Sequence, residues 1–367
     1  MTLTNYWWLL IWLALAGGLL AVAVPKKPVQ VLGKTEYRWS WGAALVLACP
    51  YVIWAANRIN FGDTEVYRRT FRNIPTLGGA LTSYLSEHGK DQGFTVLVSV
   101  IKTLIGSNDK LFFFLIATFQ MFCIIYFLRK YSTSFLLSVF MFVISTDYLS
   151  WMFNGMRQFI AVCIVLLSFG LVLRKKYIPA VLVILLASTI HASALIMIPL
   201  IFVIQGHSWN WKTLLMLVGV GAAILLIDPF TSFVDSILAE TQYNDIITND
   251  IWENDNGTNA LRALFYSIPA ILSLIGKRFV DRENSPIVNL CVNCSVCTVA
   301  LYILSVFSSG IYIGRLPIYT TLPGYVAVPW LIEHMFTKQS AKIITGGLIC
   351  GYLAFFFYQM YFAWNIL

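Results

Sequence analysis

Long apolar runs separated by short polar stretches follow one another along almost the whole chain. Most of these runs have roughly the length that a helix needs to cross a lipid bilayer, about 20 residues. The pattern therefore predicts an all-α polytopic membrane protein, with residues 1–367 forming a single integral membrane domain. The runs occupy residues 5–24, 40–56, 110–128, 134–150, 159–173, 178–204, 213–227, 261–276, 286–307, 316–332 and 343–362.

Composition supports this class. The chain is 59% hydrophobic and only 11% charged, and a soluble domain of 367 residues has no interior large enough to bury that much apolar surface. Its 12 Trp and 18 Tyr residues suit the interfacial belts of a membrane protein.

The distribution of Lys and Arg gives the orientation of the first spans. Lys26, Lys27, Lys34 and Arg38 lie in the loop after the first run. Because cytoplasmic loops carry an excess of Lys and Arg, this loop is expected inside and the N-terminus outside. The basic clusters at 129–130 and 174–176 then also lie inside.

The run 178–204 decides the rest of the topology. A single crossing would place Lys277, Arg278 and Arg282 outside, against the positive-inside tendency. If the chain turns back near His191, each half is about 20 Å of helix, too short for a crossing, and those residues stay inside. We therefore expect about ten transmembrane helices plus a re-entrant hairpin with His191 at its tip, and both termini outside.

Two large outer loops, 57–109 and 228–260, are expected to carry structure of their own. Asp63 is predicted to cap a short interfacial helix, and a second amphipathic helix is predicted from Gly93 to about Ile105. The acidic loop 228–260 contains no Lys or Arg. It fails the pattern of a calcium loop, so we expect a solvated lid over sugar hydroxyls and no metal site.

Arg157 is the first candidate for chemistry. It opens a span on the outer side, with Asn154 and Gln158 beside it. A guanidinium donates in a planar fork that fits phosphate, and the flanking amides favour a ligand site. The alternative is an interfacial anchor that extends to the lipid headgroups.

His191 and Arg315 are the next candidates. His191 lies in an Ala/Ser-rich break, where it is either a packed, hydrogen-bonded imidazole or a general base for proton transfer. Arg315 follows Tyr312 in a glycine-containing outer turn between two spans. This turn places Arg315 either next to a ligand or at the interface as an anchor.

Several short motifs together resemble a known family. The chain resembles the EpsG-like branch of Wzy-type polysaccharide polymerases over roughly residues 50–320. A third motif that often reads Glu-Pro-Gly-Tyr in that family is Asp-Gln-Gly-Phe here. The matching residues are Asp63 with Tyr67, Asp91-Gln92-Gly93-Phe94, Asn154-x-x-Arg157-Gln158, His191-x-Ser193 and Arg315.

The resemblance implies a glycosyltransferase of the bacterial inner membrane. It would join undecaprenyl-diphosphate-linked oligosaccharide repeat units on the outer face, for capsule, exopolysaccharide or O-antigen synthesis. Arg157 and Arg315 would stabilise the diphosphate leaving group, and His191, or secondly Asp63, would be the base. The substrate-binding residues would be Arg58, Tyr67, Asp91, Asn154, Gln158, Ser193 and Tyr312.

The resemblance also sets expectations for partners. Membrane lipids, a flippase and a chain-length regulator are expected, with no nucleic acid, cofactor or metal. Two alternatives stay open. One is a glycosyltransferase that uses a lipid-phosphate sugar and a metal held by Asp63 and Glu65. The other is a lipid-linked glycan flippase or transporter, for which an internal repeat is expected and none is visible.

Overall fold

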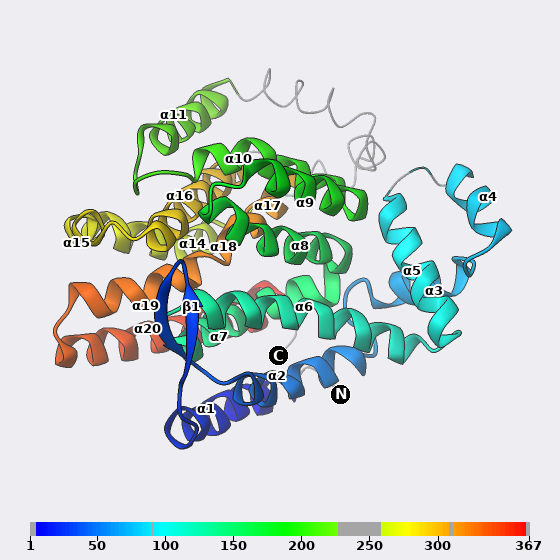
Figure 1. The fold of residues 1–367 in the computed structure, drawn as a ribbon, viewed down its shortest axis with the longest axis horizontal. Helices are drawn as coiled ribbons and strands as arrows, with labels where there is room; N and C mark the ends of the chain where they lie inside the picture. Colours follow the sequence, from blue (N-terminus) through cyan, green and yellow to red (C-terminus); the bar gives the residue numbers. More distant parts are fainter. Residues whose placement is uncertain (1–4, 88, 90, 227–257, 308–310, 365–367) are drawn as a thin grey trace.

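The computed structural model describes residues 5–87, 89, 91–226, 258–307 and 311–364. These residues are almost entirely helical (Figure 1). The first half of the chain contains α1 (Tyr6–Ala23), β1 (Lys27–Val31), β2 (Lys34–Arg38), α2 (Trp41–Ala56), α3 (Thr64–Asn73), α4 (Gly79–Glu87), α5 (Gln92–Ile105), α6 (Asp109–Tyr131), α7 (Phe135–Ile144), the π-helix η2 (Tyr148–Asn154) and α8 (Met156–Leu173).

The second half completes the bundle. It contains α9 (Tyr177–Ile190), the 3₁₀-helix η3 (Ala192–Ile196), α10 (Met197–Val203), α11 (Trp211–Leu225), α14 (Ala260–Ile275), α15 (Lys277–Glu283), α16 (Pro286–Phe307), α17 (Ile311–Arg315), α18 (Ile318–Thr321), α19 (Gly324–Met335), α20 (Lys338–Tyr358) and the π-helix η5 (Gln359–Ala363).

The protein is a membrane protein, but its helices are more broken than the apolar runs predict. Among the described residues, five helices are long and apolar enough to cross a bilayer: α1, α6, α8, α16, and α20 with η5. The number rises to seven if the bent pairs α7–η2 and α14–α15 each count as one span. The expected ten full spans are therefore not confirmed, because α2, α11 and α19 have only 16, 15 and 12 residues.

The expectation of an all-α chain needs one small correction. The basic loop after α1 forms an antiparallel hairpin in which Lys27 pairs with Arg38 and Val31 with Lys34. Leu32 and Gly33 both have positive φ, 50° and 82°, as in the two-residue turns that match the twist of a hairpin.

The reversal predicted at His191 is present. A straight helix over residues 177–203 would be about 40 Å long. Instead, Tyr177 at the start of α9 and Gln205 just after α10 line the same pocket of about 240 Å³. The chain therefore turns back on itself at His191, which separates α9 from η3.

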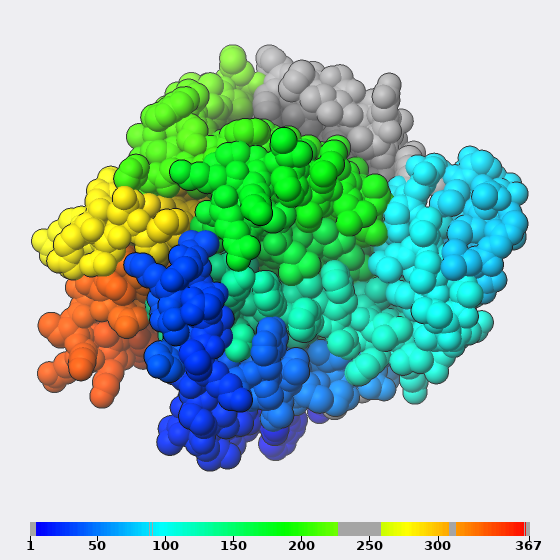
Figure 2. Space-filling model, in the orientation of Figure 1, coloured from blue at the N-terminus to red at the C-terminus, as the bar shows by residue number. Residues whose placement is uncertain are grey.

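Loop 57–109, which is expected on the outer side, folds into α3, α4 and α5, which lie together at one edge of the molecule (Figures 1 and 2). Asp63 occupies the N-cap position of α3, but its side chain makes no capping hydrogen bond, so the predicted capping role is wrong. The predicted lid, loop 228–260, falls almost wholly outside the described residues.

One continuous cluster of buried apolar side chains extends from Tyr6 to Met360 and joins the helices. Other apolar side chains face outward. On α1, Leu15, Leu19 and Val22 are 71%, 69% and 89% exposed. A row of exposed aliphatic side chains on a helix of this length suits contact with lipid.

Candidate active site

The site is built around a break in a helix. α7 and η2 are bent by 65° relative to each other, and the wide turns of η2 end at Asn154. Single π-helical turns are frequent at functional sites because they redirect the side chains that follow. Here the break places Asn154 and Arg157, at the start of α8, beside loop 57–109.

The turn before α3 packs directly on Asn154. The backbone N–H of Asp63 donates to Asn154 Oδ1 at 3.0 Å. Gly62 has a φ of +50°, and a Cβ at this position would collide with the Asn154 amide. The positive φ and the close contact with Asn154 therefore both require glycine at position 62. The contact fixes Asp63 next to the start of α8.

Residues of α3 and α5, two helices of loop 57–109, contact Arg157. Its Nη1 lies 3.1 Å from Asp91 Oδ2, and its guanidinium lies 5.7 Å from the centre of the Phe94 ring. Its backbone N–H donates to the Tyr67 hydroxyl at 3.4 Å. The Asp91 side chain is 4% exposed while that of Arg157 is 39% exposed, so a part of the guanidinium stays open to a ligand.

Backbone geometry explains how Asp91 reaches Arg157. Asp91 has a φ of 50°, in the left-handed region that Asp tolerates better than most residues. Its carboxylate pairs with Arg157 and makes no capping hydrogen bond to its own helix, α5. At Gly93 a Cβ would collide with Thr189, so this glycine lets α5 approach α9 just before His191.

A chain of hydrogen bonds links three segments that are far apart in the sequence. Gln158 Nε2 donates to Ser193 Oγ and to the backbone oxygen of Arg315, at 3.2 Å each. Ser193 Oγ also lies 2.7 Å from His191 Nδ1 and 2.9 Å from the Tyr319 hydroxyl. His191 is 7% exposed and Gln158 is 3% exposed, so this network is largely shielded from solvent.

Positive charge surrounds Asp63. Burial raises the pKa of its carboxyl group, and Arg315, Arg157 and Arg58 oppose that rise. All three arginines therefore act electrostatically on Asp63. This concentration of cations around one half-buried acid fits the binding of an anion more than the binding of a metal cation.

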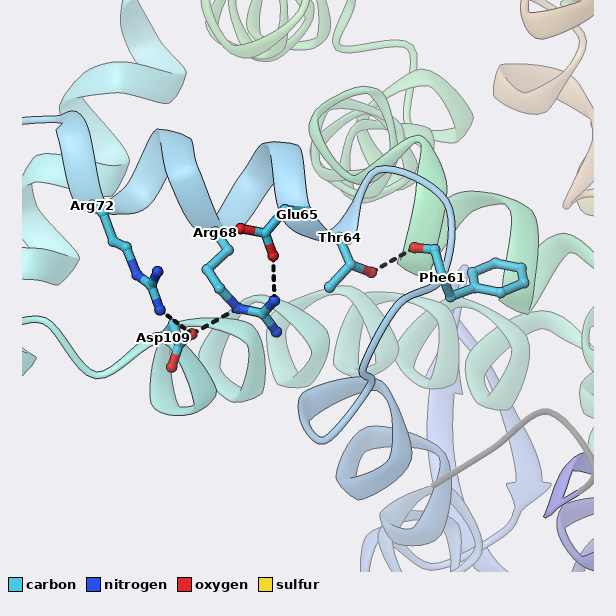
Figure 3. Close-up of polar contacts among 6 residues, drawn as sticks. All are labelled: Phe61, Thr64, Glu65, Arg68, Arg72 and Asp109. Carbon is cyan, nitrogen blue, oxygen red and sulfur yellow. Dashed lines mark hydrogen bonds and ion pairs between the residues drawn. The ribbon is translucent and has the colours of Figure 1, made fainter.

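Arg58 and Glu65 lie in different surroundings from the other predicted residues. Arg58 is 5% exposed; its Nη1 donates to the Met152 carbonyl at 2.5 Å and its guanidinium stacks 4.2 Å from the Phe113 ring. Glu65 accepts from Arg68, which also donates to Asp109 (Figure 3). Glu65 thus belongs to an ion-pair cluster at the rim of the molecule.

Beside the network lies a cavity of about 870 Å³. Of the predicted site residues, Asn154 and Arg315 line it, and Gly62 brings Asp63 to its edge. The side chain of Tyr312 lies outside the described residues, so its predicted role stays a prediction. The cavity is lined by Phe61, Gly62, Ser150, Trp151, Asn154, Gly155, Thr258, Asn259, Arg262, Gly314, Arg315, Phe355, Tyr358, Gln359, Phe362 and Trp364.

Sequence reasoning missed a second buried polar cluster, centred on Asp147 in the break between α7 and η2. Asp147 is 1% exposed and accepts from the hydroxyls of Tyr266 and Tyr325, at 2.5 Å each. Arg262 lies over the Tyr266 ring, 5.7 Å from its centre. The available signal was a lone acid within the apolar run 134–150, since ionisable residues at membrane depth usually mark a functional or structural polar site.

The thiols and carboxylates of the described residues do not form a recognisable metal site. No group of three or more His, Cys, Asp or Glu side chains in this part of the chain is arranged to hold one. Cys291, Cys294 and Cys297 are free and buried within α16.

The fold and the site define the class, a polytopic helical membrane protein in which loop 57–109 and the helix breaks bring arginines, amides and a histidine together. The chain belongs to the EpsG family, whose model matches residues 43–365. This is the family of Wzy-like polymerases, and membership indicates a membrane glycosyltransferase of the polymerase type. Comparison with curated proteins and with solved structures gave no match.

Proposed function

We propose that the protein is a polysaccharide polymerase that joins polyprenyl-diphosphate-linked oligosaccharide repeat units on the outer face of the bacterial cytoplasmic membrane. The observation that supports this most is the convergence of Arg157, Arg315 and His191. The three residues come from α8, α17 and the tip of the α9–α10 reversal. Gln158, next to Arg157 in α8, bonds to the Arg315 backbone oxygen and, through Ser193, is linked to His191.

The reaction uses these groups in one displacement. An acceptor sugar hydroxyl attacks the anomeric carbon of the donor chain, and the bond from that carbon to the lipid diphosphate oxygen breaks. The hydroxyl proton passes to His191, with Asp63 as the second candidate for this role. The electron pair leaves with the diphosphate, whose negative charge Arg157 and Arg315 stabilise.

The arrangement of Arg157 suits a diphosphate. One side of its guanidinium is fixed by Asp91, and the exposed part retains donors for a phosphate oxygen. A fixed donor stabilises developing charge without having to reorient during the reaction. Asn154, Tyr67 and Asp91 are then positioning residues, which hold the loop and the arginine in place.

The finer features of the reaction form part of the same proposal. The lipid is expected to be undecaprenyl, the product a capsule, exopolysaccharide or O-antigen, and the membrane the inner membrane with both termini outside. A flippase would deliver the repeat units and a chain-length regulator would set the product length.

The test is polymerisation by the purified protein in lipid nanodiscs, supplied with lipid-linked repeat units. We expect a ladder of products that differ by one repeat unit, with one polyprenyl diphosphate released for each linkage. A nucleotide sugar supplied in place of the lipid-linked unit is expected to give no product. Transfer of single sugars from a lipid monophosphate, without a ladder, would contradict the proposal.

A further inference from the structure

Three residues that line the cavity each carry a buried hydrogen-bond donor. Ser150 Oγ, Trp151 Nε1 and Arg262 Nε are each shielded from solvent and have no hydrogen-bond partner within the part of the chain that the structure describes. All three residues line the 870 Å³ cavity. Leaving a buried donor unpaired costs free energy, so three around one cavity point to a ligand that accepts hydrogen bonds.

Arg262 is oriented by the buried cluster beneath it. Its guanidinium rests on the Tyr266 ring, and the hydroxyl of Tyr266 is fixed by Asp147 and by the backbone oxygen of Ser145, at 2.5 and 3.0 Å. The Asp147 carboxylate is also occupied by Tyr325. Among the described residues Arg262 makes no direct ion pair, and the buried Asp147 carboxylate offsets part of its charge.

The charge of the residues that line the cavity indicates which kind of ligand fits it. Arg262 and Arg315 both line the cavity, and no Asp or Glu is among the described residues that do. A neutral sugar hydroxyl both donates and accepts, whereas an oxyanion only accepts and carries the opposite charge. Unpaired donors and two guanidinium groups around one cavity therefore match an oxyanion.

We propose that Ser150, Trp151 and Arg262 form an oxyanion subsite in this cavity, in addition to the diphosphate contacts assigned to Arg157. The proposal rests on the proposed function, because the oxyanion would belong to its substrate. Two sources have the required chemistry: a phosphate of the lipid diphosphate, or an acidic group on a sugar of the repeat unit.

The experiment measures binding without turnover. Radiolabelled farnesyl diphosphate is bound to the purified protein in nanodiscs, and unlabelled farnesol, inorganic pyrophosphate, glucuronate and glucose are tested as competitors. Arg262→Gln is expected to weaken binding of the effective oxyanion at least about tenfold, since hydrogen bonds to charged groups are the stronger ones. Trp151→Phe and Ser150→Ala are expected to weaken it about threefold each.

Matched controls use the same substitutions outside the cavity. Arg72→Gln alters a rim arginine that faces Asp109 (Figure 3). Trp54→Phe alters another indole whose buried Nε1 has no partner among the described residues, but which packs against Tyr6 and Phe153. Both controls are expected to bind within twofold of the unmodified protein.

The competitors separate the two sources. If pyrophosphate competes, and competes less well in Arg262→Gln, the subsite belongs to the lipid diphosphate. If glucuronate competes but glucose does not, and the competition by glucuronate weakens in the same variant, the subsite belongs to an acidic sugar. Unchanged binding of both oxyanions by a monodisperse Arg262→Gln protein would overturn the subsite. Because binding is measured without turnover, loss of polymerisation alone would count against the proposed function and leave this result standing.

Discussion

At the residue scale, the partners of Arg157 decide what its replacement by lysine does. Lysine keeps the charge but loses the planar fork that contacts Asp91 on one side and leaves donors for a ligand on the other. We expect Arg157→Lys to insert normally and to lose at least about tenfold in polymer synthesis. The measurement is polymer formation per unit of protein, with membrane insertion followed by immunoblot.

Arg72→Lys is the matched control for this change. Arg72 also lies in loop 57–109, but its side chain is 58% exposed and faces Asp109 at the rim. Full polymer synthesis by Arg157→Lys would mean that Arg157 only anchors α8 at the membrane interface.

The identity of the base can be read from the pH profile. If His191 is the base, His191→Gln should lose at least about 10²-fold in rate and flatten the acid limb. Burial raises the pKa of Asp63, so an Asp63 base would lose its carboxylate form, and its activity, as pH falls through that raised value. Both hypotheses thus predict a rate that falls toward acid pH, but each predicts that a different variant removes this limb.

The measurement is the rate between about pH 5 and 8 for the unmodified protein, His191→Gln and Asp63→Asn. A flattened acid limb in Asp63→Asn, together with near-normal turnover in His191→Gln, would transfer the base assignment to Asp63.

At the scale of the element, the reversal at His191 predicts on which side of the membrane α10 ends. We expect a cysteine at His207 to face the cytoplasm, like the basic segment 174–176. His207 is preferred to Ser208, which is only 3% exposed and whose N–H is bonded to Asn289. An impermeant thiol reagent should label His207→Cys, in a cysteine-free background, only after the membrane is opened.

Arg69→Cys, on the exposed side of α3, is the control for the outer face and should be labelled in intact cells. Labelling of His207→Cys from outside would place the end of α10 outside and invert the topology of everything after it.

The positions of the apolar runs predict the positions of the helices well, but not where the helices break. Hydropathy averages over a window, so a lone Asp147 hardly lowers the score of the run 134–150. The bend depends on tyrosines more than 100 residues away, which bond to Asp147. The β1–β2 hairpin was missed for a similar reason, since its strands are short and its Leu-Gly turn is a weak signal.

At the scale of the whole molecule, the charge of the site predicts independence from metal ions. Arginines rather than a cation would stabilise the leaving diphosphate, so polymerisation by the purified protein should proceed at an undiminished rate after treatment with EDTA. Glu65→Gln should also have little effect, because Glu65 pairs with Arg68 at the rim. Loss of activity in EDTA that magnesium restores would favour the alternative in which Asp63 and Glu65 hold a metal.

The sequence identified most of the residues that meet in the site, because Arg157, Gln158 and His191 are polar residues in or beside apolar runs. It could not show which of them touch. The contacts of Gly62 with Asn154 and of Gly93 with Thr189 join segments about 90 residues apart, and no local pattern encodes such pairs. Arg262 was missed as a site residue because its orientation depends on the Asp147 cluster.

The hydroxyl of Ser193 has a consequence for the histidine beside it. The Arg315 carbonyl can only accept a hydrogen bond, so the Gln158 atom that faces it is the amide nitrogen Nε2. Because this nitrogen only donates, Gln158 also donates to Ser193 Oγ. One proton and one lone pair of Ser193 then remain for His191 Nδ1 and the Tyr319 hydroxyl.

If Ser193 donates to Tyr319, His191 carries its proton on Nδ1 and its Nε2 is the basic nitrogen. If Ser193 donates to His191, the proton sits on Nε2 and the ring presents a donor there. The direction of the Tyr319 O–H and the tautomer of the imidazole are therefore reversed together.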